Sequence, residues 1–62
     1  MKIKELIECI KLEINDTFVS FESETRAYIF HKKPEIIKEA AETISDNFDV
    51  QINNTIITIQ KK

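Results

Sequence analysis

Residues 17–31 constrain the fold of this chain more than any other stretch, because their pattern predicts two short strands that are apolar on both faces. The segment TFVSFESETRAYIFH holds three of the four phenylalanines and the only tyrosine, with a polar turn at residues 22–25. A half-buried strand normally alternates between an apolar and a polar face. A hairpin with two apolar faces needs a second surface to pack against in addition to its own core. The two faces are Phe18, Ala27 and Ile29 on one side, and Val19, Phe21, Tyr28 and Phe30 on the other.

The length of the chain, 62 residues, predicts a single domain, residues 1–62, that is marginally stable as a monomer. A domain of this size buries only about 60% of the surface that its unfolded chain exposes. Disulfides, a bound metal or oligomerisation usually supply the missing stability. The single cysteine cannot form an internal disulfide, and one histidine with one cysteine offers no zinc-ligand spacing. We therefore expect a homodimer without a cofactor or a metal.

The charge and the distribution of apolar residues indicate a cytoplasmic protein. Eleven acidic residues against nine basic ones give a net charge of −2, which disfavours a general nucleic-acid binder. No apolar run approaches the roughly 20 residues of a membrane span. Lys2, Lys4 and Glu5 interrupt the apolar start that a signal peptide requires. The chain also lacks glycine, so the usual phosphate-binding loops and nucleophile elbows cannot be built.

The spacing of apolar residues predicts two helices and a second hairpin. Apolar residues recur every three or four positions over residues 2–14, and again from Pro34 to about residue 45. Residues 48–60 alternate as strands do, and Asn53-Asn54 suits a two-residue type I′ turn, in which both central residues have positive φ. This turn would pair Phe48 with Ile59, Val50 with Ile57 and Ile52 with Thr55.

An internal repeat relates the two halves of the chain. When the sequence is shifted by thirty residues, ELIECIKLEINDTF lies over EIIKEAAETISDNF, with five identities that include Phe18 over Phe48. The identities coincide with the predicted elements, which favours two helix–hairpin units, residues 3–31 and 34–60. The predicted fold is α+β with the order αββαββ. It contains a four-stranded, mainly antiparallel sheet with both helices on one face.

The repeat also predicts which side of the first hairpin points away from the helices. It places residues 23–24 where the second hairpin has residues 53–54, so that Phe18, Ala27 and Ile29 face the helices. The opposite face is a candidate interface with a second copy or with another protein. If the register differs, the same residues fill the core of the monomer instead. This candidate interface consists of Val19, Phe21, Tyr28, Phe30 and Ile56.

Two charged clusters are further candidate binding surfaces. An acidic stripe on the second helix could meet a basic partner or imitate nucleic-acid phosphates, although a solvated helix face has the same pattern. It comprises Glu35, Glu39, Glu42 and Asp46. A basic cluster near one end of the first hairpin could bind single-stranded nucleic acid, or could discourage aggregation at a sheet edge. It comprises Arg26, His31, Lys32 and Lys33.

No residue pattern indicates catalysis. The pattern places no serine or cysteine beside His31, and Cys9 lies on or near an apolar helix face, where packing is its ordinary role. The carboxylates fall on exposed helix faces, and a domain this small can hardly enclose a concave active site. We therefore expect no enzymatic activity.

The opening of the chain resembles a known class of inhibitors. The pattern M-x-I-x-x-L-I-x-x-I-K over residues 1–11, running from a helix into strands, is similar to the start of small anti-CRISPR proteins from Gram-positive prophages. The resemblance covers one helix and implies an inhibitor that occludes a host protein. We therefore expect a non-enzymatic, homodimeric, phage-type inhibitor of a host defence or regulatory protein. The alternatives are a small nucleic-acid-binding regulator and an acidic antitoxin-like module.

Overall fold

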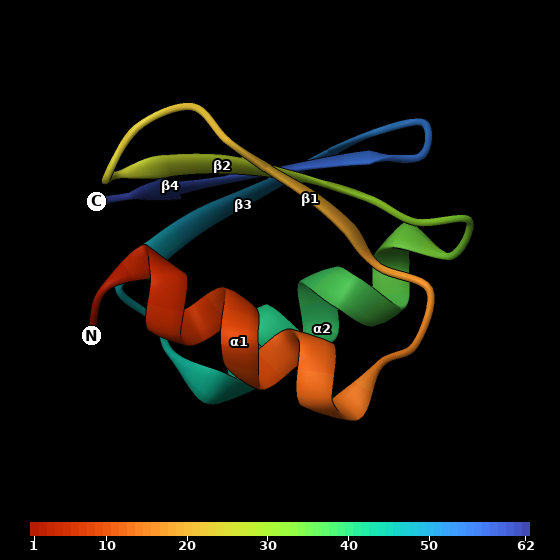
Figure 1. Cartoon of the computed structure of the whole chain (residues 1–62), viewed down its shortest axis with the longest axis horizontal. Coiled ribbons are helices and arrows are strands. Elements are labelled where there is room, and N and C mark those ends of the chain that lie inside the picture. The colour runs from red at the N-terminus through yellow and green to blue at the C-terminus, as the bar shows by residue number, and fades with distance from the viewer.

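The computed structural model describes every residue from Met1 to Lys62 as two layers, a sheet and two helices that pack against one of its faces (Figure 1). The elements are α1 Ile3–Glu13, β1 Phe18–Phe21, β2 Arg26–Phe30, α2 Pro34–Ile44, β3 Phe48–Asn53 and β4 Ile56–Lys61. The four strands lie in the order β1-β2-β4-β3, and all neighbours are antiparallel. The predicted α+β fold and its element order are therefore confirmed.

Helix α1 forms where apolar residues recur every three or four positions, and it buries one side against the sheet. The buried residues are Ile3, Leu6, Ile7 and Ile10. At the start of the helix the backbone N–H of Lys2 donates to the Glu5 carboxylate at 2.8 Å, which satisfies a group that the helix leaves free. The helix ends at Ile14, whose backbone is extended, and Asp16 then adopts a left-handed conformation with a φ of 60°. These two residues turn the chain towards β1.

Helix α2 begins at the only proline in the chain. Pro34 has the φ value that a first helical turn requires, and its missing N–H is one that this turn would leave unpaired. Ile37 and Ala41 bury the inner side of the helix. The helix ends at Ser45, which has an extended backbone and donates its N–H to the Ala41 carbonyl oxygen. The helix therefore ends without a residue in the left-handed conformation.

The core lies between the two helices and the central strands β2 and β4. Ala27 and Ile29 of β2, with Ile57 and Ile59 of β4, are completely buried beneath the helices. In the pairing of these two strands, Tyr28 lies opposite Thr58, the residue thirty positions later. The two helix–hairpin halves therefore meet at the middle of the sheet.

The second hairpin turns one residue later than predicted. Asn53 pairs with Ile56, so the two turn residues are Asn54 and Thr55, and only Asn54 has a positive φ, 58°. The predicted type I′ turn at Asn53-Asn54 is therefore wrong, and each pair is shifted by two residues along β4. A shift of two preserves the side on which every side chain lies. Val50 accordingly still faces the helices, now opposite Ile59.

The first hairpin departs from its predicted register by one residue. The backbone N–H groups of Glu22 and Ser23 both donate to the carbonyl oxygen of Arg26, at 3.0 and 3.1 Å. Two residues facing one is the hydrogen-bond pattern of a β-bulge, which inserts an extra residue into one strand. A shift of one residue moves every side chain of the strand to the opposite face.

The β-bulge therefore reverses the predicted faces of β1. Val19 pairs with Ile29 and packs against the core, and Phe21 pairs with Ala27 on the same helix-facing side. Phe18 pairs with Phe30 on the outer side and is 71% exposed. The prediction that Phe18 points inward and that Val19 and Phe21 point outward is wrong for this reason.

Candidate functional site

The face of the sheet that the helices leave uncovered, called the outer face below, begins with an apolar row at one end. Phe18 of β1 lies opposite Phe30 of β2, and Phe30 lies opposite Ile56 of β4. Phe18 and Phe30 are 71% and 40% exposed, and Ile56 is half-buried. Cross-strand neighbours on one face have Cβ atoms about 5 Å apart, so these three side chains form one continuous apolar strip.

The outer face becomes polar in two steps along the strands. The middle row contains Ser20, Tyr28, Thr58 and Gln51. The row at the far end contains Arg26, Gln60 and Asp49. The face therefore changes from aromatic to charged along the strand direction.

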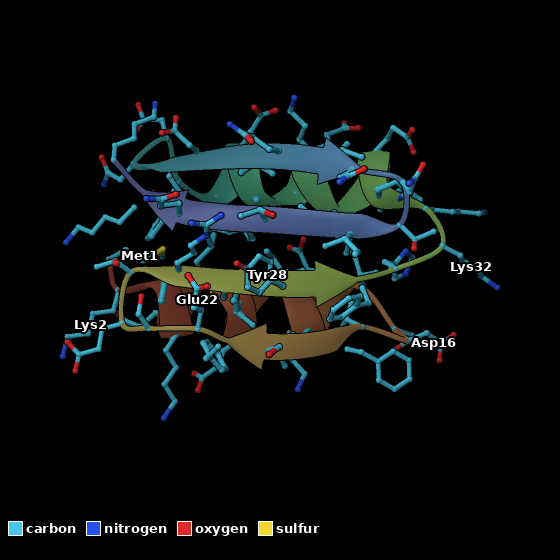
Figure 2. The ribbon with its side chains drawn as sticks, turned by 90° about the horizontal axis from the view of Figure 1, so that it is seen from above. Met1, Lys2, Asp16, Glu22, Tyr28 and Lys32 are labelled. Carbon is cyan, nitrogen blue, oxygen red and sulfur yellow. The ribbon has the colours of Figure 1, made fainter.

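Three side chains at the charged end of the outer face are held together. The Tyr28 hydroxyl donates to Glu22 Oε1 at 3.0 Å, and Arg26 Nε lies 3.5 Å from Glu22 Oε2. The Arg26 guanidinium also lies 5.6 Å from the centre of the Tyr28 ring, within cation–π range. Figure 2 shows Glu22 over the sheet beside Tyr28. The Arg26–Glu22 distance is long for a hydrogen bond, so this contact is an exposed ion pair of small energetic weight.

The hydrogen bond to Glu22 raises the pKa of Tyr28 above its ordinary value. Burial acts in the same direction, because both effects favour the neutral phenol over the charged phenolate. The positive charge of Arg26 lowers the pKa in part, and the negative charge of Glu22 raises it further. Tyr28 is therefore a neutral hydrogen-bond donor at physiological pH.

A shallow hollow of about 420 Å³ adjoins the apolar row. It is lined by Asp16, Phe18, Phe30, His31, Lys32 and Thr55. His31 is the one buried residue of this lining and is 9% exposed. The Lys33 backbone N–H donates to His31 Nδ1 at 3.0 Å, so the other ring nitrogen carries the hydrogen and donates to the Asn15 carbonyl oxygen at 3.2 Å. Both ring nitrogens are thus committed to the backbone of two connecting segments.

A larger hollow of about 740 Å³ lies on the opposite end of the molecule, between the start of α1, the first hairpin turn and the end of β4. Phe21 lines it and is half-exposed, although its side chain is on the helix-facing side of β1. Three lysines and one glutamate surround the hollow, which gives it a positive charge. These residues are Lys2, Lys4, Lys61 and Glu24.

The predicted interface is only partly assembled. Tyr28, Phe30 and Ile56 lie together on the outer face, but Val19 and Phe21 do not. Phe18 takes their place, and sequence reasoning missed it. The signal was available: Ser20 shares the outer side with Phe18, while Val19 and Phe21 form the fully apolar side of β1, which ordinarily faces a core. The role of this surface as a dimer interface stays a prediction.

The two charged clusters have different outcomes. The acidic residues Glu35, Glu39, Glu42 and Asp46 are all exposed. The three glutamates lie on the side of α2 opposite the buried Ile37 and Ala41, whereas Asp46 follows the end of the helix. The basic residues are not brought together. Arg26 begins β2, whereas Lys32 and Lys33 follow its other end, and His31 is buried between them. The four residues cannot clamp one nucleotide, and binding of nucleic acid elsewhere stays untested.

Three further observations concern chemistry and similarity. Cys9 is a half-buried free thiol on α1, and no group of three histidine, cysteine, aspartate or glutamate side chains is placed to hold a metal ion. Neither helix has the length and apolar character needed to cross a membrane. No protein-family model matches the chain, and neither the curated proteins nor the solved structures contain a significantly similar one.

Proposed function

We propose that this chain is a non-enzymatic interaction protein that docks another protein on the outer face of its sheet. The observation that carries the proposal is the row of Phe18, Phe30 and Ile56. Two exposed aromatic rings beside an aliphatic side chain form the kind of anchor around which protein interfaces are organised.

The size of the outer face fits this role. The molecule measures 25 × 20 × 16 Å and exposes 4300 Å². A stable interface covers about 800 Å² on each partner, which is about a fifth of this surface. The apolar row covers only one end of the face, so a complementary partner needs an apolar site beside a polar one. The pair of Arg26 and Glu22 lies at the far, charged end of the face, where that polar site would contact it.

The mode of action we propose is occlusion. A small, rigid domain with one apolar sheet face can block a surface of a larger protein without any chemical step, as the resemblance to phage-type inhibitors implies. The partner is then a host defence or regulatory protein with an apolar groove or patch. The acidic stripe on α2 remains exposed in this arrangement and provides a second surface of opposite character.

Site-specific photo-crosslinking tests the proposal. A photoreactive phenylalanine analogue replaces Phe30 in one protein and Leu12 in a matched control, because Leu12 is 87% exposed on α1, away from the outer face. We expect a discrete adduct with a foreign protein from position 30 and none from position 12. Excess unlabelled wild-type protein should compete for the adduct, and excess Phe18→Glu protein should not.

Two outcomes would contradict the proposal. Equal adducts from positions 12 and 30 would indicate non-specific contact. An adduct of twice the chain mass from position 30 would assign the outer face to self-association, as the sequence predicts, and would remove it as a docking site for a foreign protein.

A further inference from the structure

The free edge of β3 is the least protected pairing surface of the fold. β1 and β3 are the two edge strands of the sheet. β1 has four residues and ends at the β-bulge, and both features discourage pairing with another chain. β3 has six residues, FDVQIN, with no proline, lysine or bulge. In Figure 2, β3 is the uppermost strand, and no ribbon lies beyond it.

The unpaired backbone groups of this edge belong to alternate residues. The Lys62 N–H donates to the Asn47 carbonyl oxygen at 3.1 Å, which fixes the phase of the ladder between β3 and β4. In an antiparallel ladder, alternate residues direct both backbone groups to the same neighbour. The odd-numbered residues of β3 therefore bond to β4. The even-numbered residues direct their N–H and C=O groups away from the sheet, and these are Phe48, Val50 and Ile52.

We propose that two copies of this chain pair through β3 in antiparallel orientation, with Val50 opposite the partner's Val50. Phe48 then lies opposite the partner's Ile52, and each of these pairs exchanges two backbone hydrogen bonds. Every unpaired group of the even-numbered residues gains a partner in this register. The result is one continuous sheet that joins the four strands of each copy.

The side chains of β3 select this register. Asp49 lies opposite the partner's Gln51, so a carboxylate meets an amide. A shift of two residues in one direction would place Asp49 opposite the partner's Asp49, and like charges directly across an antiparallel pair are destabilising. A shift of two residues in the opposite direction would move Phe48 past the end of the partner's β3, so Phe48 would have no strand residue to pair with. The strand is therefore complementary to itself in one register.

The edge also extends the apolar core across the junction. Val50 is partly buried against the core, and Ile52 is 37% exposed on the same helix-facing side. Pairing places Ile52 beside the partner's Phe48, which covers apolar surface that the single copy leaves in water. The three glutamates of the acidic stripe lie on the side of α2 opposite Ile37 and Ala41, away from the sheet, so they do not oppose the approach.

This dimer leaves the outer face uncovered and does not depend on the proposed docking of a foreign protein. It places self-association at the sheet edge, whereas the sequence alone predicts it through the sheet face. The two arrangements make opposite predictions for the same variants. The edge dimer responds to changes at Gln51, and the face dimer responds to changes at Phe30.

Amide hydrogen exchange at two protein concentrations tests the edge dimer without any substitution. In the dimer, the amides of Phe48, Val50 and Ile52 gain hydrogen-bond partners, so their exchange should slow as the concentration rises. The amides of the odd-numbered residues of β3 already bond to β4, so their exchange should slow much less, only to the extent that dimerisation stabilises the whole fold. Exchange at Phe48, Val50 and Ile52 that does not vary up to the highest soluble concentration would overturn the proposal.

Charge substitutions at Gln51 test the register. Sedimentation equilibrium should show that Gln51→Lys tightens the dimer roughly fivefold, because each lysine meets the partner's Asp49, and that Gln51→Asp weakens it by a similar factor. The control pair Asn53→Lys and Asn53→Asp lies on the same strand and face but beyond the paired residues, so it should leave the dimer constant unchanged. A dimer that dissociates on Phe30→Glu and ignores position 51 would refute edge pairing.

Discussion

The Nε2 atom of His31 lies 3.2 Å from the carbonyl oxygen of Asn15, so the residue after β2 fastens the segment that leads into β1. The same ring accepts a hydrogen bond from the Lys33 backbone N–H at 3.0 Å. One buried side chain therefore joins the connection between α1 and β1 to the connection between β2 and α2.

Replacing His31 with phenylalanine should lower the free energy of unfolding by about 1–3 kcal/mol, because it leaves backbone groups of Asn15 and Lys33 without partners. His31→Asn keeps a hydrogen-bond acceptor near the position of Nδ1 and should therefore lose less stability. Denaturant unfolding measures both. For a domain of this size, 1 kcal/mol corresponds to about 4–8 °C in the melting temperature. Equal stability of His31→Phe and wild type would show that the two hydrogen bonds of the ring do not stabilise the fold.

The pKa of Tyr28 should respond in opposite directions to its two charged neighbours. Glu22→Ala removes the hydrogen-bond acceptor and should lower the pKa towards the ordinary tyrosine value, whereas Arg26→Ala removes a positive charge and should raise it. Tyrosinate absorbance reports this titration cleanly, since the chain has one tyrosine and no tryptophan. Glu24→Ala, in the same turn, serves as the control. A fall in the pKa on Arg26→Ala would contradict the assigned causes.

The raised pKa of Tyr28 also links stability to alkaline pH. The folded chain favours the neutral phenol more than the unfolded chain does. The resulting stabilisation is complete below the ordinary tyrosine pKa and is lost as the pH rises through the raised value. Tyr28→Phe should therefore flatten the pH dependence of the free energy of unfolding in that alkaline window. Near neutral pH, the same variant should leave this pH dependence unchanged.

The β-bulge makes Phe18 and Val19 differ in their contribution to stability. Val19→Ala removes methyl groups that pack against the core and should cost about 1 kcal/mol. Phe18→Ala changes an exposed ring and should stay within about 0.5 kcal/mol of wild type. Thermal unfolding of the two variants distinguishes the observed register from the one predicted from the repeat, in which the order of the two effects is reversed.

The second turn allows a similar test at adjacent asparagines. Asn54 has a φ of 58°, so Asn54→Ala should cost about 1 kcal/mol, while Asn54→Gly should be neutral or stabilising. Asn53 belongs to β3 and has no positive φ, so Asn53→Ala should have little effect. Chemical denaturation measures the free energy of unfolding of both alanine variants. A comparable loss of stability in Asn53→Ala and Asn54→Ala would favour the type I′ turn at residues 53–54 instead.

The helices, the strands and their order along the chain were predictable because apolar spacing is strong in every element. The faces of β3 and β4 were also predictable, since an error of two residues in the turn leaves each side chain on the same side. The faces of β1 were predicted wrongly. Both sides of that strand carry a phenylalanine, so Ser20 alone indicated which side is exposed. The register taken from the repeat outweighed this signal, and the repeat does not indicate the bulge at Glu22-Ser23.

The candidate site was predictable to the extent that it depends on β2 and β4. Tyr28, Phe30 and Ile56 follow from the alternation of two central strands whose other sides are buried isoleucines and alanine. The spread of the basic residues could not be foreseen from proximity in the sequence. Arg26 and Lys32 lie at or beyond opposite ends of the extended strand β2, and six positions at about 3.3 Å per residue span most of the molecule.

The pairing of Tyr28 with Thr58 at the centre of the sheet has a kinetic consequence. Neither half of the chain can complete the sheet before the two halves meet, so closing this long loop is expected to limit the folding rate. We expect Ile29→Val and Ile57→Val to slow folding, and Val19→Ala, at an edge, to act mainly by accelerating unfolding. Stopped-flow measurements of folding and unfolding would separate the two effects. Pairing of β2 with β4 at the centre of the sheet would then be the slow step, and pairing of the edge strands would be fast.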